Sequence, residues 1–352
     1  MSLYTNELYL EDIIRVANVD LPWEKLQGKS VLLSGATGLL GSFLVDVLLQ
    51  KNTDGLDCTV YALGRTQKKA EERFSKWWGD RHLVFLLYNV NQPFVRDDIG
   101  TVDYVLHLAS NTHPMQYATD PIGTITTNII GLQNMLDFAV EHRATRFAFT
   151  SSNEIYGENR GDAEMFNERY CGYIDSNTLR AGYPESKRCG EALCQAYKSQ
   201  KGLDVVIPRF TRSYGPTMLL SDSKAISQFI RKGIAGEDIV LKSEGTQNYS
   251  YTYMADAIYG LLTVILRGES GEAYNIADEA SNITLKALAK IIADHAGKQV
   301  VFEIPDAIEA AGYSMATKAL LDGSKLKKLG WKPFYTIQDG IPRTIDILKT
   351  IQ

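Results

Sequence analysis

Three glycines at intervals of three residues constrain the fold of this 352-residue chain more than any other feature. Residues 31–34 (VLLS) predict a short buried strand, Gly35, Gly38 and Gly41 follow, and the apolar residues of 43–49 open a helix. In such a unit the first glycine allows a tight turn, the second lets the backbone approach a pyrophosphate, and the third lets helix and strand pack closely. Free N–H groups at the helix start favour phosphate. Three glycines alone would indicate only a turn, but this order of strand, turn and helix predicts a dinucleotide site.

Composition and charge exclude several classes of function. Hydrophobic residues make up 45% and charged residues 22% of the chain, which is typical of a globular protein. The net charge of −5 argues against a general nucleic-acid binder, because such a protein carries a basic stripe. The longest apolar run, residues 261–266, is far shorter than the ~20 residues that cross a bilayer, so we expect no membrane association.

The cysteines predict neither a metal site nor a disulfide framework. No Cys-x-x-Cys pair and no metal-ligand spacing with the five histidines is present among Cys58, Cys171, Cys189 and Cys194. The first residues are acidic and lack the apolar core of a secretory leader. We therefore expect a reducing, cytoplasmic location.

The order of predicted elements indicates an α/β fold with a doubly wound parallel sheet, the Rossmann type. Further strands are predicted at 58–63, 83–90, 102–108, 146–151 and 205–208, and the long helices begin near 121 and 184. After residue 208 the segments become shorter and more polar, with helices at 225–235, 255–266 and 285–296. We expect an N-terminal extension (1–28) with a short docking helix, a dinucleotide-binding domain (29–208) and a smaller α/β substrate domain (209–352).

The cofactor is expected at the carboxyl ends of the parallel strands. Arg65 follows the second strand, where many dinucleotide folds place an acidic residue on the ribose, and Lys68 and Lys69 stand nearby. An arginine there favours NADP slightly, because it can accept a 2′-phosphate; it could equally stack on adenine and leave NAD bound, or the charges could form a solvated turn. Asn89 could bond the adenine edge. The candidate cofactor residues are Gly35, Thr37, Gly38, Leu39, Leu40, Gly41, Arg65, Asn89, Val90, Leu108, Ala109, Ser110, Tyr183 and Lys187.

Tyr183 and Lys187 form the first candidate catalytic pair. Pro184 suits the first position of a helix, so Tyr183 is expected at the helix start with Lys187 one turn further on the same face. A phenol with a pKa of about 10 is a poor base at neutral pH, and a nearby ammonium lowers that pKa. A Tyr-x-x-x-Lys spacing is common by chance. It indicates a catalytic pair only in a chain that also has the glycine turn of a dinucleotide site.

The segment TSSNEIYG (150–157), at the end of a predicted strand, supplies the second candidate set. Ser152 could bond a substrate hydroxyl, although serines often only cap turns. Glu154 is expected at the same sheet edge, either as a solvated loop residue or as a second acid/base.

The motifs GATGLLG, HLAS, TSSNEIYG, YPESK and RSYGP, in this order, resemble the extended short-chain dehydrogenase/reductases that act on nucleotide sugars. The similarity covers roughly residues 28–345. It implies a tightly held NAD or NADP that is reduced and reoxidised within one cycle, with Ser152, Tyr183 and Lys187 as catalytic trio. It further implies that Tyr183 removes the proton of the sugar 4-hydroxyl while Lys187 holds the nicotinamide ribose.

Three stretches are most similar to the UDP-glucuronate decarboxylases (UDP-xylose synthases), namely residues 107–136, 180–202 and 212–230. The resemblance also places a glutamate at the position of Glu154 in decarboxylases and in sugar 4,6-dehydratases, and typically not in 4-epimerases. We therefore expect decarboxylation of a nucleoside diphosphate sugar, with dehydration and then epimerisation as alternatives. A non-catalytic dinucleotide sensor is an alternative of another class, but such proteins lack the Tyr–Lys pair.

Two positions depart from the family pattern. Arg212 stands where the family usually has asparagine, and Tyr249 stands where it usually has an arginine that contacts the nucleotide phosphates. We hypothesise that Arg212 supplies the phosphate charge that position 249 lacks. The candidate substrate residues are Ser110, Ser152, Asn153, Arg212 and Tyr249. Family members commonly dimerise through a four-helix bundle, which implies a homodimer through the helices near 121–140 and 184–200.

Overall fold

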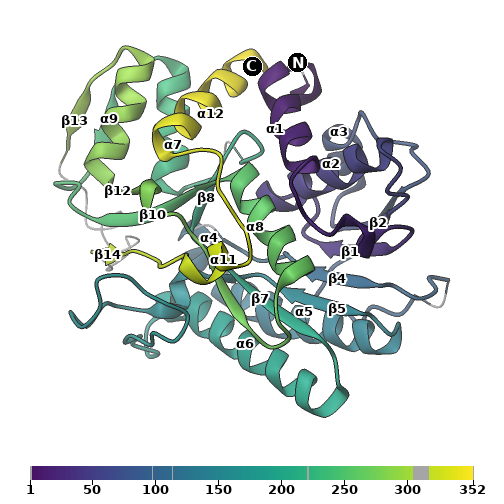
Figure 1. Cartoon of the computed structure of the whole chain (residues 1–352). Helices are drawn as coiled ribbons and strands as arrows, with labels where there is room; N and C mark the ends of the chain where they lie inside the picture. The colour runs from purple at the N-terminus through teal and green to yellow at the C-terminus, as the bar shows by residue number, and fades with distance from the viewer. Residues whose placement is uncertain (1, 97, 113, 220–221, 304–316, 352) are drawn as a thin grey trace.

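A parallel β-sheet runs through the centre of the computed structural model, which describes residues 2–96, 98–112, 114–219, 222–303 and 317–351 (Figure 1). The strand order is β11-β7-β5-β4-β1-β2-β3, with β6 beside β7, and all of these pairings are parallel. The strands are β1 (Ser30–Ser34), β2 (Thr59–Gly64), β3 (Leu83–Leu87), β4 (Tyr104–His107), β5 (Arg146–Phe149), β6 (Ser151–Ser152), β7 (Val205–Phe210) and β11 (Ala273–Ile276). The predicted doubly wound α/β fold is confirmed.

Both faces of this sheet are covered because its strands are apolar on both sides. Along β1, Val31 and Leu33 belong to one buried cluster together with Phe43 of α2, whereas Leu32 belongs to a second cluster with Leu132 of α5. Consequently α5 and α6 lie below the sheet in Figure 1 and α2 and α8 lie above it. These helices are α2 (Leu39–Thr53), α5 (Pro121–Glu141), α6 (Gly182–Lys201) and α8 (Met254–Arg267), with the shorter α3 (Gln67–Arg73) and α4 (Pro114–Thr119).

A second, smaller set of strands and helices lies beside the large sheet, mainly at the upper left of Figure 1. The strand β10 (Asn248–Tyr253) pairs with β8 (Arg212–Tyr214), β12 (Asn282–Thr284) and β14 (Lys318–Ala319), and β9 (Ile239–Leu241) pairs with β13 (Val300–Phe302). The helices here are α7 (Ala225–Ala235), α9 (Leu285–Ala296), α11 (Ser324–Lys328) and α12 (Ile337–Ile351). Because β11 joins the large sheet beside β7, the chain returns to that sheet after residue 208.

The N-terminal helix α1 (Glu7–Ala17) docks on the body as expected, through a buried and mostly apolar face that also carries Asp12. Asp12 accepts hydrogen bonds from the hydroxyls of Tyr253 (2.6 Å) and Tyr335 (2.7 Å) and from Nε of Arg343 (2.9 Å). Burial raises the pKa of Asp12, and these donors oppose the shift. Since Tyr253 lies on β10 and Arg343 on α12, this one carboxylate holds α1 against the smaller region.

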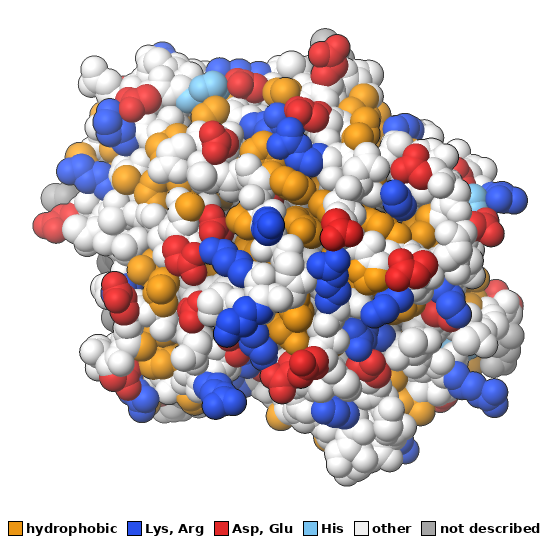
Figure 2. All heavy atoms as spheres, in the orientation of Figure 1, with side chains coloured by type: hydrophobic (Ala, Val, Ile, Leu, Met, Phe, Trp, Pro, Cys, Tyr) orange, Lys and Arg blue, Asp and Glu red, His pale blue; other side chains and the backbone are white. Residues whose placement is uncertain are grey.

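Charges of both signs alternate over the face shown in Figure 2, without a large area of one sign. Such a surface agrees with the small negative net charge. Within the described ranges, no helix has the length and apolarity needed to span a membrane.

Candidate active site

The glycine turn joins β1 to α2, and each glycine meets a different constraint. Gly35 has φ +72°, and a Cβ on it would lie 2.8 Å from the amide nitrogen of Ala109. A Cβ on Gly41 would lie 2.3 Å from the carbonyl oxygen of Gly35, so the start of α2 packs directly on the turn. A Cβ on Gly38 would meet only that same oxygen, at 3.2 Å. The chain itself therefore leaves room beside Gly38, next to free N–H groups at a helix start, which fits a dinucleotide pyrophosphate.

The ends of β1 and β4 are locked together beside this turn. The Ser34 hydroxyl accepts a hydrogen bond from the Ala109 amide (3.2 Å) and lies 2.9 Å from Nδ1 of His107. Burial and then the nearby charge of Lys187 lower the pKa of His107 to about 3, so this ring is neutral. The partly exposed Ser110, with its neighbours Leu108 and Ala109, therefore has a fixed position at the strand end.

The other candidate cofactor residues surround the same edge. Arg65 is exposed at the end of β2, and Asn89 is exposed beyond β3, where its side chain accepts a hydrogen bond from the amide of Asn91 (3.2 Å). Val90 is buried against Gly131 of α5. The side chains of Thr37, Leu39 and Leu40 are partly exposed along the glycine turn and the start of α2.

Tyr183 lies buried at the start of α6, where only 6% of it is exposed. The helix begins at Gly182, two residues earlier than predicted, so Pro184 occupies its third position. The missing N–H still falls in the first turn, where no intrahelical partner is required. The side chains of Ser152 and Ser110 lie close enough to the Tyr183 hydroxyl to lower its pKa, which brings three candidate residues together.

The expected lowering of the Tyr183 pKa by Lys187 is wrong. Burial raises the pKa of Tyr183 to about 12, although its hydrogen bond with Ser152 lowers it in part. Nζ of Lys187 lies 5.9 Å from the centre of the Tyr183 ring and donates to the carbonyl oxygen of Thr150 (2.8 Å). Burial lowers the pKa of Lys187 to about 7. Much of the positive charge that would stabilise a phenolate is therefore lost near neutral pH.

A chain of buried hydrogen bonds ties Ser110 to Tyr183. The Ser110 hydroxyl donates to Oδ1 of Asn128 (2.8 Å), Nδ2 of Asn128 donates to the Ser186 hydroxyl (2.9 Å), and Ser186 donates to the carbonyl oxygen of Tyr183 (2.8 Å). Sequence analysis missed Asn128 and Ser186. A buried amide on an otherwise apolar helix needs partners, so Asn128 within the apolar pattern of α5 was the available signal.

Ser152 has the capping role that was considered for it, and it also lies beside Tyr183. Its hydroxyl accepts a hydrogen bond from the Glu154 amide (3.2 Å) and so caps the short 3-10 turn Asn153–Tyr156, and it also contacts Tyr183. The cap fixes the backbone of Glu154 next to Ser152.

Glu154 is not a free loop carboxylate, because it forms an ion pair with Arg180. Nη2 of Arg180 donates to Oε2 of Glu154 at 2.6 Å. The guanidinium carbon lies 4.9 Å from the centre of the Tyr117 ring, and Tyr117 in turn stacks on Tyr183 with ring centres 4.9 Å apart. Sequence analysis missed both Arg180 and Tyr117, although each lies within a stretch that carries the family resemblance.

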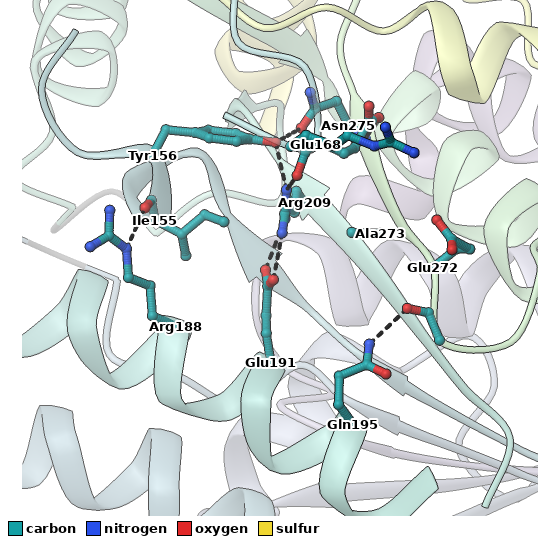
Figure 3. A network of polar contacts seen from close by, with 12 residues as sticks. Ile155, Tyr156, Glu168, Arg188, Glu191, Gln195, Arg209, Glu272, Ala273 and Asn275 are labelled. Atoms are coloured by element: carbon teal, nitrogen blue, oxygen red, sulfur yellow. Dashed lines mark hydrogen bonds and ion pairs between the residues drawn. The ribbon is translucent and has the colours of Figure 1, made fainter. Parts of the chain in front are cut away.

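A polar network behind the site anchors the segment that carries Ser152 and Glu154 (Figure 3). Arg209 of β7 donates to both carboxylate oxygens of Glu191 (2.9 and 2.6 Å) and to the Tyr156 hydroxyl (2.9 Å). Tyr156 donates to Oδ1 of Asn275 on β11 (2.6 Å), and Arg188 of α6 donates to a carbonyl oxygen of the same segment (2.7 Å). Side chains of β7, β11 and α6 thus hold the 3-10 turn Asn153–Tyr156 in place.

Arg212 and Tyr249, the two departures from the family pattern, are in direct contact. The guanidinium carbon of Arg212 on β8 lies 3.6 Å from the centre of the Tyr249 ring on β10. Nη1 of Arg212 is buried and has no hydrogen-bond partner within the described ranges. Arg212 follows Phe210 by two residues, and Phe210 pairs with Ser152, so the backbone of Arg212 lies just beyond the strand end that carries Ser152.

Comparisons with known proteins agree with this geometry. The model of the NAD dependent epimerase/dehydratase family matches residues 31–277. UDP-glucuronic acid decarboxylase 1 of Xenopus tropicalis is 30% identical over 319 residues, which are 90% of this chain and 71% of that protein. UDP-glucuronic acid decarboxylase 3 of Arabidopsis thaliana is 30% identical over 313 residues, 89% of this chain and 86% of that protein. The crystal structure of DesIV, a dTDP-glucose 4,6-dehydratase from Streptomyces venezuelae, shares the fold, with a TM-score of 0.78 and 24% identity over 91% of this chain and 97% of that chain.

Proposed function

The chain belongs to the NAD-dependent epimerase/dehydratase family, and from that premise we propose that it decarboxylates a nucleoside diphosphate sugar acid of the UDP-glucuronate type. The observation that carries the proposal is the contact of the Tyr183 hydroxyl with Ser152 and Ser110, next to the Glu154–Arg180 ion pair. A proton acceptor for a sugar hydroxyl and a second acid/base thereby share one site. Dehydration at carbons 5 and 6 is the second candidate, because the same residues serve it.

Tyr183 accepts the proton of the sugar 4-hydroxyl, and Ser152 holds that hydroxyl by a hydrogen bond. NAD, when bound, supplies the oxidant that the C4 alcohol requires and the reductant that restores it. The glycine turn would hold the pyrophosphate, and Lys187 would hold the nicotinamide ribose. Releasing Lys187 from Thr150 towards a ribose would also strengthen its effect on the Tyr183 phenol, because an ammonium near a phenolate stabilises it.

The carboxylate of Glu154 supports a step beyond epimerisation. A 4-ketone makes the C6 carboxylate a β-keto acid, so the C5–C6 bond breaks, carbon dioxide leaves and the electron pair is delocalised onto O4. Glu154, after taking up a proton from solvent, then delivers it to C5. A non-catalytic sensor would not need these three residues at one site, whereas here Ser152 lies beside the Tyr183 hydroxyl and Nζ of Lys187 lies 5.9 Å from the centre of the Tyr183 ring.

For the cofactor, NAD follows from the family, and Arg65 supports some acceptance of NADP. Burial and then the charge of Arg65 lower the pKa of Lys69, so two basic side chains stand close together after β2. Such a pair favours the additional phosphate of NADP. Extraction of the bound cofactor and its mass identify it, and Arg65→Ser should weaken NADP binding while NAD binding is kept.

We further propose a homodimer through α5 and α6. Apolar side chains of α5 point outward, with Ile122 76%, Ile130 46% and Ile125 38% exposed, and Leu179 before α6 is 71% exposed. Exposed apolar residues on α5 and on the turn directly before α6 favour burial against a second copy. Sedimentation should give a dimer, and replacing Ile122 and Ile130 together by aspartate should give a monomer.

The division of the chain and its location complete the proposal. We assign cofactor binding to residues 29–208 and binding of the sugar nucleotide to residues 209–352. We infer that residues 1–28 hold the smaller region in place, which is supported by the hydrogen bonds of Asp12 with Tyr253 and Arg343. A cytoplasmic location is supported by the thiol state of all four cysteines.

Incubation with UDP-glucuronate, UDP-glucose and dTDP-glucose tests the function. Decarboxylation predicts transient absorbance of reduced nicotinamide and a product lighter by carbon dioxide with UDP-glucuronate alone. Loss of water would favour the dehydratase, an isomer of unchanged mass the epimerase, and no reaction with any sugar nucleotide would contradict the enzyme. Tyr183→Phe should abolish the absorbance change while the bound cofactor is retained.

A further inference from the structure

Arg180 has an unusual set of neighbours for an arginine on the turn before a helix. It lies in the 3-10 turn Leu179–Ala181, directly before α6, and it contacts Glu154 on one side and the face of Tyr117 on another. Through Tyr117 it is one ring away from Tyr183. Because only the Tyr117 ring lies between them, a sugar bound at the Tyr183 hydroxyl would have the Arg180 guanidinium nearby.

The ion pair with Glu154 uses only part of the guanidinium. Glu154 engages Nη2, whereas Nη1 is buried without a hydrogen-bond partner in the described part of the chain. Arginine binds carboxylates best through two parallel N–H···O bonds, which Glu154 does not provide here. A buried guanidinium nitrogen without an acceptor is costly, so the arrangement favours a carboxylate that can engage both nitrogens.

On the basis of the proposed function, we propose that Arg180 is the receptor for the C6 carboxylate of the sugar and that Glu154 occupies this receptor until the substrate arrives. The C6 carboxylate of the sugar binds both Nη atoms of Arg180, and the Glu154 side chain turns from Arg180 towards the sugar ring. The exchange requires no net gain of ion pairs, because one carboxylate replaces another on the same cation. It also frees Glu154 for its proton transfer only when an acidic sugar is bound.

The proposal explains how one site distinguishes a sugar acid from a neutral sugar. A hydroxymethyl group cannot replace Glu154 on a guanidinium, because it carries no charge and one oxygen only. UDP-glucose should therefore leave the Arg180–Glu154 pair intact, whereas UDP-glucuronate should open it. Substituting either partner should consequently affect the two ligands differently.

Calorimetry with NAD-bound protein that carries Tyr183→Phe tests this, because the background variant binds without turnover. Adding Arg180→Gln should weaken UDP-glucuronate binding by roughly 10- to 100-fold and change UDP-glucose binding by less than roughly threefold. Adding Glu154→Gln should instead strengthen UDP-glucuronate binding, since the internal competitor is gone. Arg180→Lys should give an intermediate loss, because it keeps the charge without the two-pronged geometry.

Arg160→Gln is the matched control, because it removes one exposed arginine, paired with Asp162, on the loop beyond Glu154. It should leave both affinities unchanged. Equal weakening of both ligands by Arg180→Gln would reduce Arg180 to a structural role and overturn the proposal, as would weaker UDP-glucuronate binding with Glu154→Gln. Failure of the proposed function is separate: it appears as absent nicotinamide reduction in the unsubstituted protein with every sugar nucleotide, whatever the affinity ratio.

Discussion

The ring of Tyr117 stacks on the ring of Tyr183, with centres 4.9 Å apart and 25° between the planes. Tyr117 belongs to α4 and Tyr183 to α6, so this contact joins two helices at the candidate base. Offset stacking between aromatic rings is favourable beyond the area it buries. The stack therefore limits how far the phenol hydroxyl can move from Ser152.

Removing that ring should impair turnover without removing a reacting group. We expect Tyr117→Ala to lower kcat for UDP-glucuronate by roughly tenfold or more, because a small displacement of a reacting group is costly. Tyr117→Phe keeps the ring and should retain most of the activity. Steady-state kinetics of both variants decide the point, and equal activity of the alanine and phenylalanine variants would contradict a positioning role.

The contact of Arg212 with Tyr249 leads to a prediction on nucleotide binding. Arg212→Ala should weaken binding of UDP by roughly 10- to 100-fold, because a charge-assisted contact to phosphate is lost. Tyr249→Phe keeps the stacked ring and should change the affinity little. Titration of the NAD-bound protein with UDP measures both. Unchanged affinity in Arg212→Ala would refute the idea that this arginine replaces the missing phosphate contact at position 249.

Lys187 gives the stability of the cofactor-free protein a defined pH dependence. Burial lowers its pKa from 10.5 to about 7 in the folded protein. Between these values the unfolded chain binds the additional proton, so raising the pH favours the folded state. The cost of burying the lysine is therefore full below about pH 7 and vanishes above about pH 10.

Urea unfolding at several pH values between about 7 and 10 measures this dependence. The free energy of unfolding of the unsubstituted protein should rise relative to that of Lys187→Met by up to about 1.4 kcal/mol per pH unit. Other titrating groups are common to both proteins and cancel in the difference. Parallel curves for the two proteins would show that Lys187 keeps an ordinary pKa in the folded state.

Much of the sheet and of the cofactor site could be predicted because the signals are local. The turn at Gly35, the buried run of β1 and the spacing of Tyr183 and Lys187 each lie within a few residues. Their order along the chain fixes a parallel sheet, since strands and helices alternate. The carboxyl ends of the strands then gather the candidate residues at one edge.

The remaining features depend on packing between distant segments, which local patterns do not specify. The Glu154–Arg180 ion pair and the stack on Tyr117 join three segments that are far apart in the sequence. The return of β11 to the large sheet is likewise a long-range pairing. The pKa of Tyr183 was misjudged for the same reason: the presence of a nearby lysine was visible in the sequence, whereas the burial of both groups was not.

The glycine turn offers a test that separates cofactor binding from folding. Gly38 has an extended backbone, and an added Cβ would meet only the carbonyl oxygen of Gly35 at 3.2 Å. Gly38→Ala should therefore change the free energy of unfolding of the cofactor-free protein by less than about 1 kcal/mol. It should nevertheless weaken NAD binding by at least about tenfold, because the methyl group occupies the space left for the pyrophosphate.

Gly41→Ala is the matched comparison, since its Cβ would lie 2.3 Å from the same oxygen and would push α2 away from β1. We expect it to destabilise the cofactor-free protein by about 1–3 kcal/mol, as overpacking does. Urea unfolding without cofactor and titration with NAD measure the two effects separately. If Gly38→Ala bound NAD as tightly as the unsubstituted protein, the space beside Gly38 would not hold the pyrophosphate, and the cofactor would have to lie elsewhere along the strand ends.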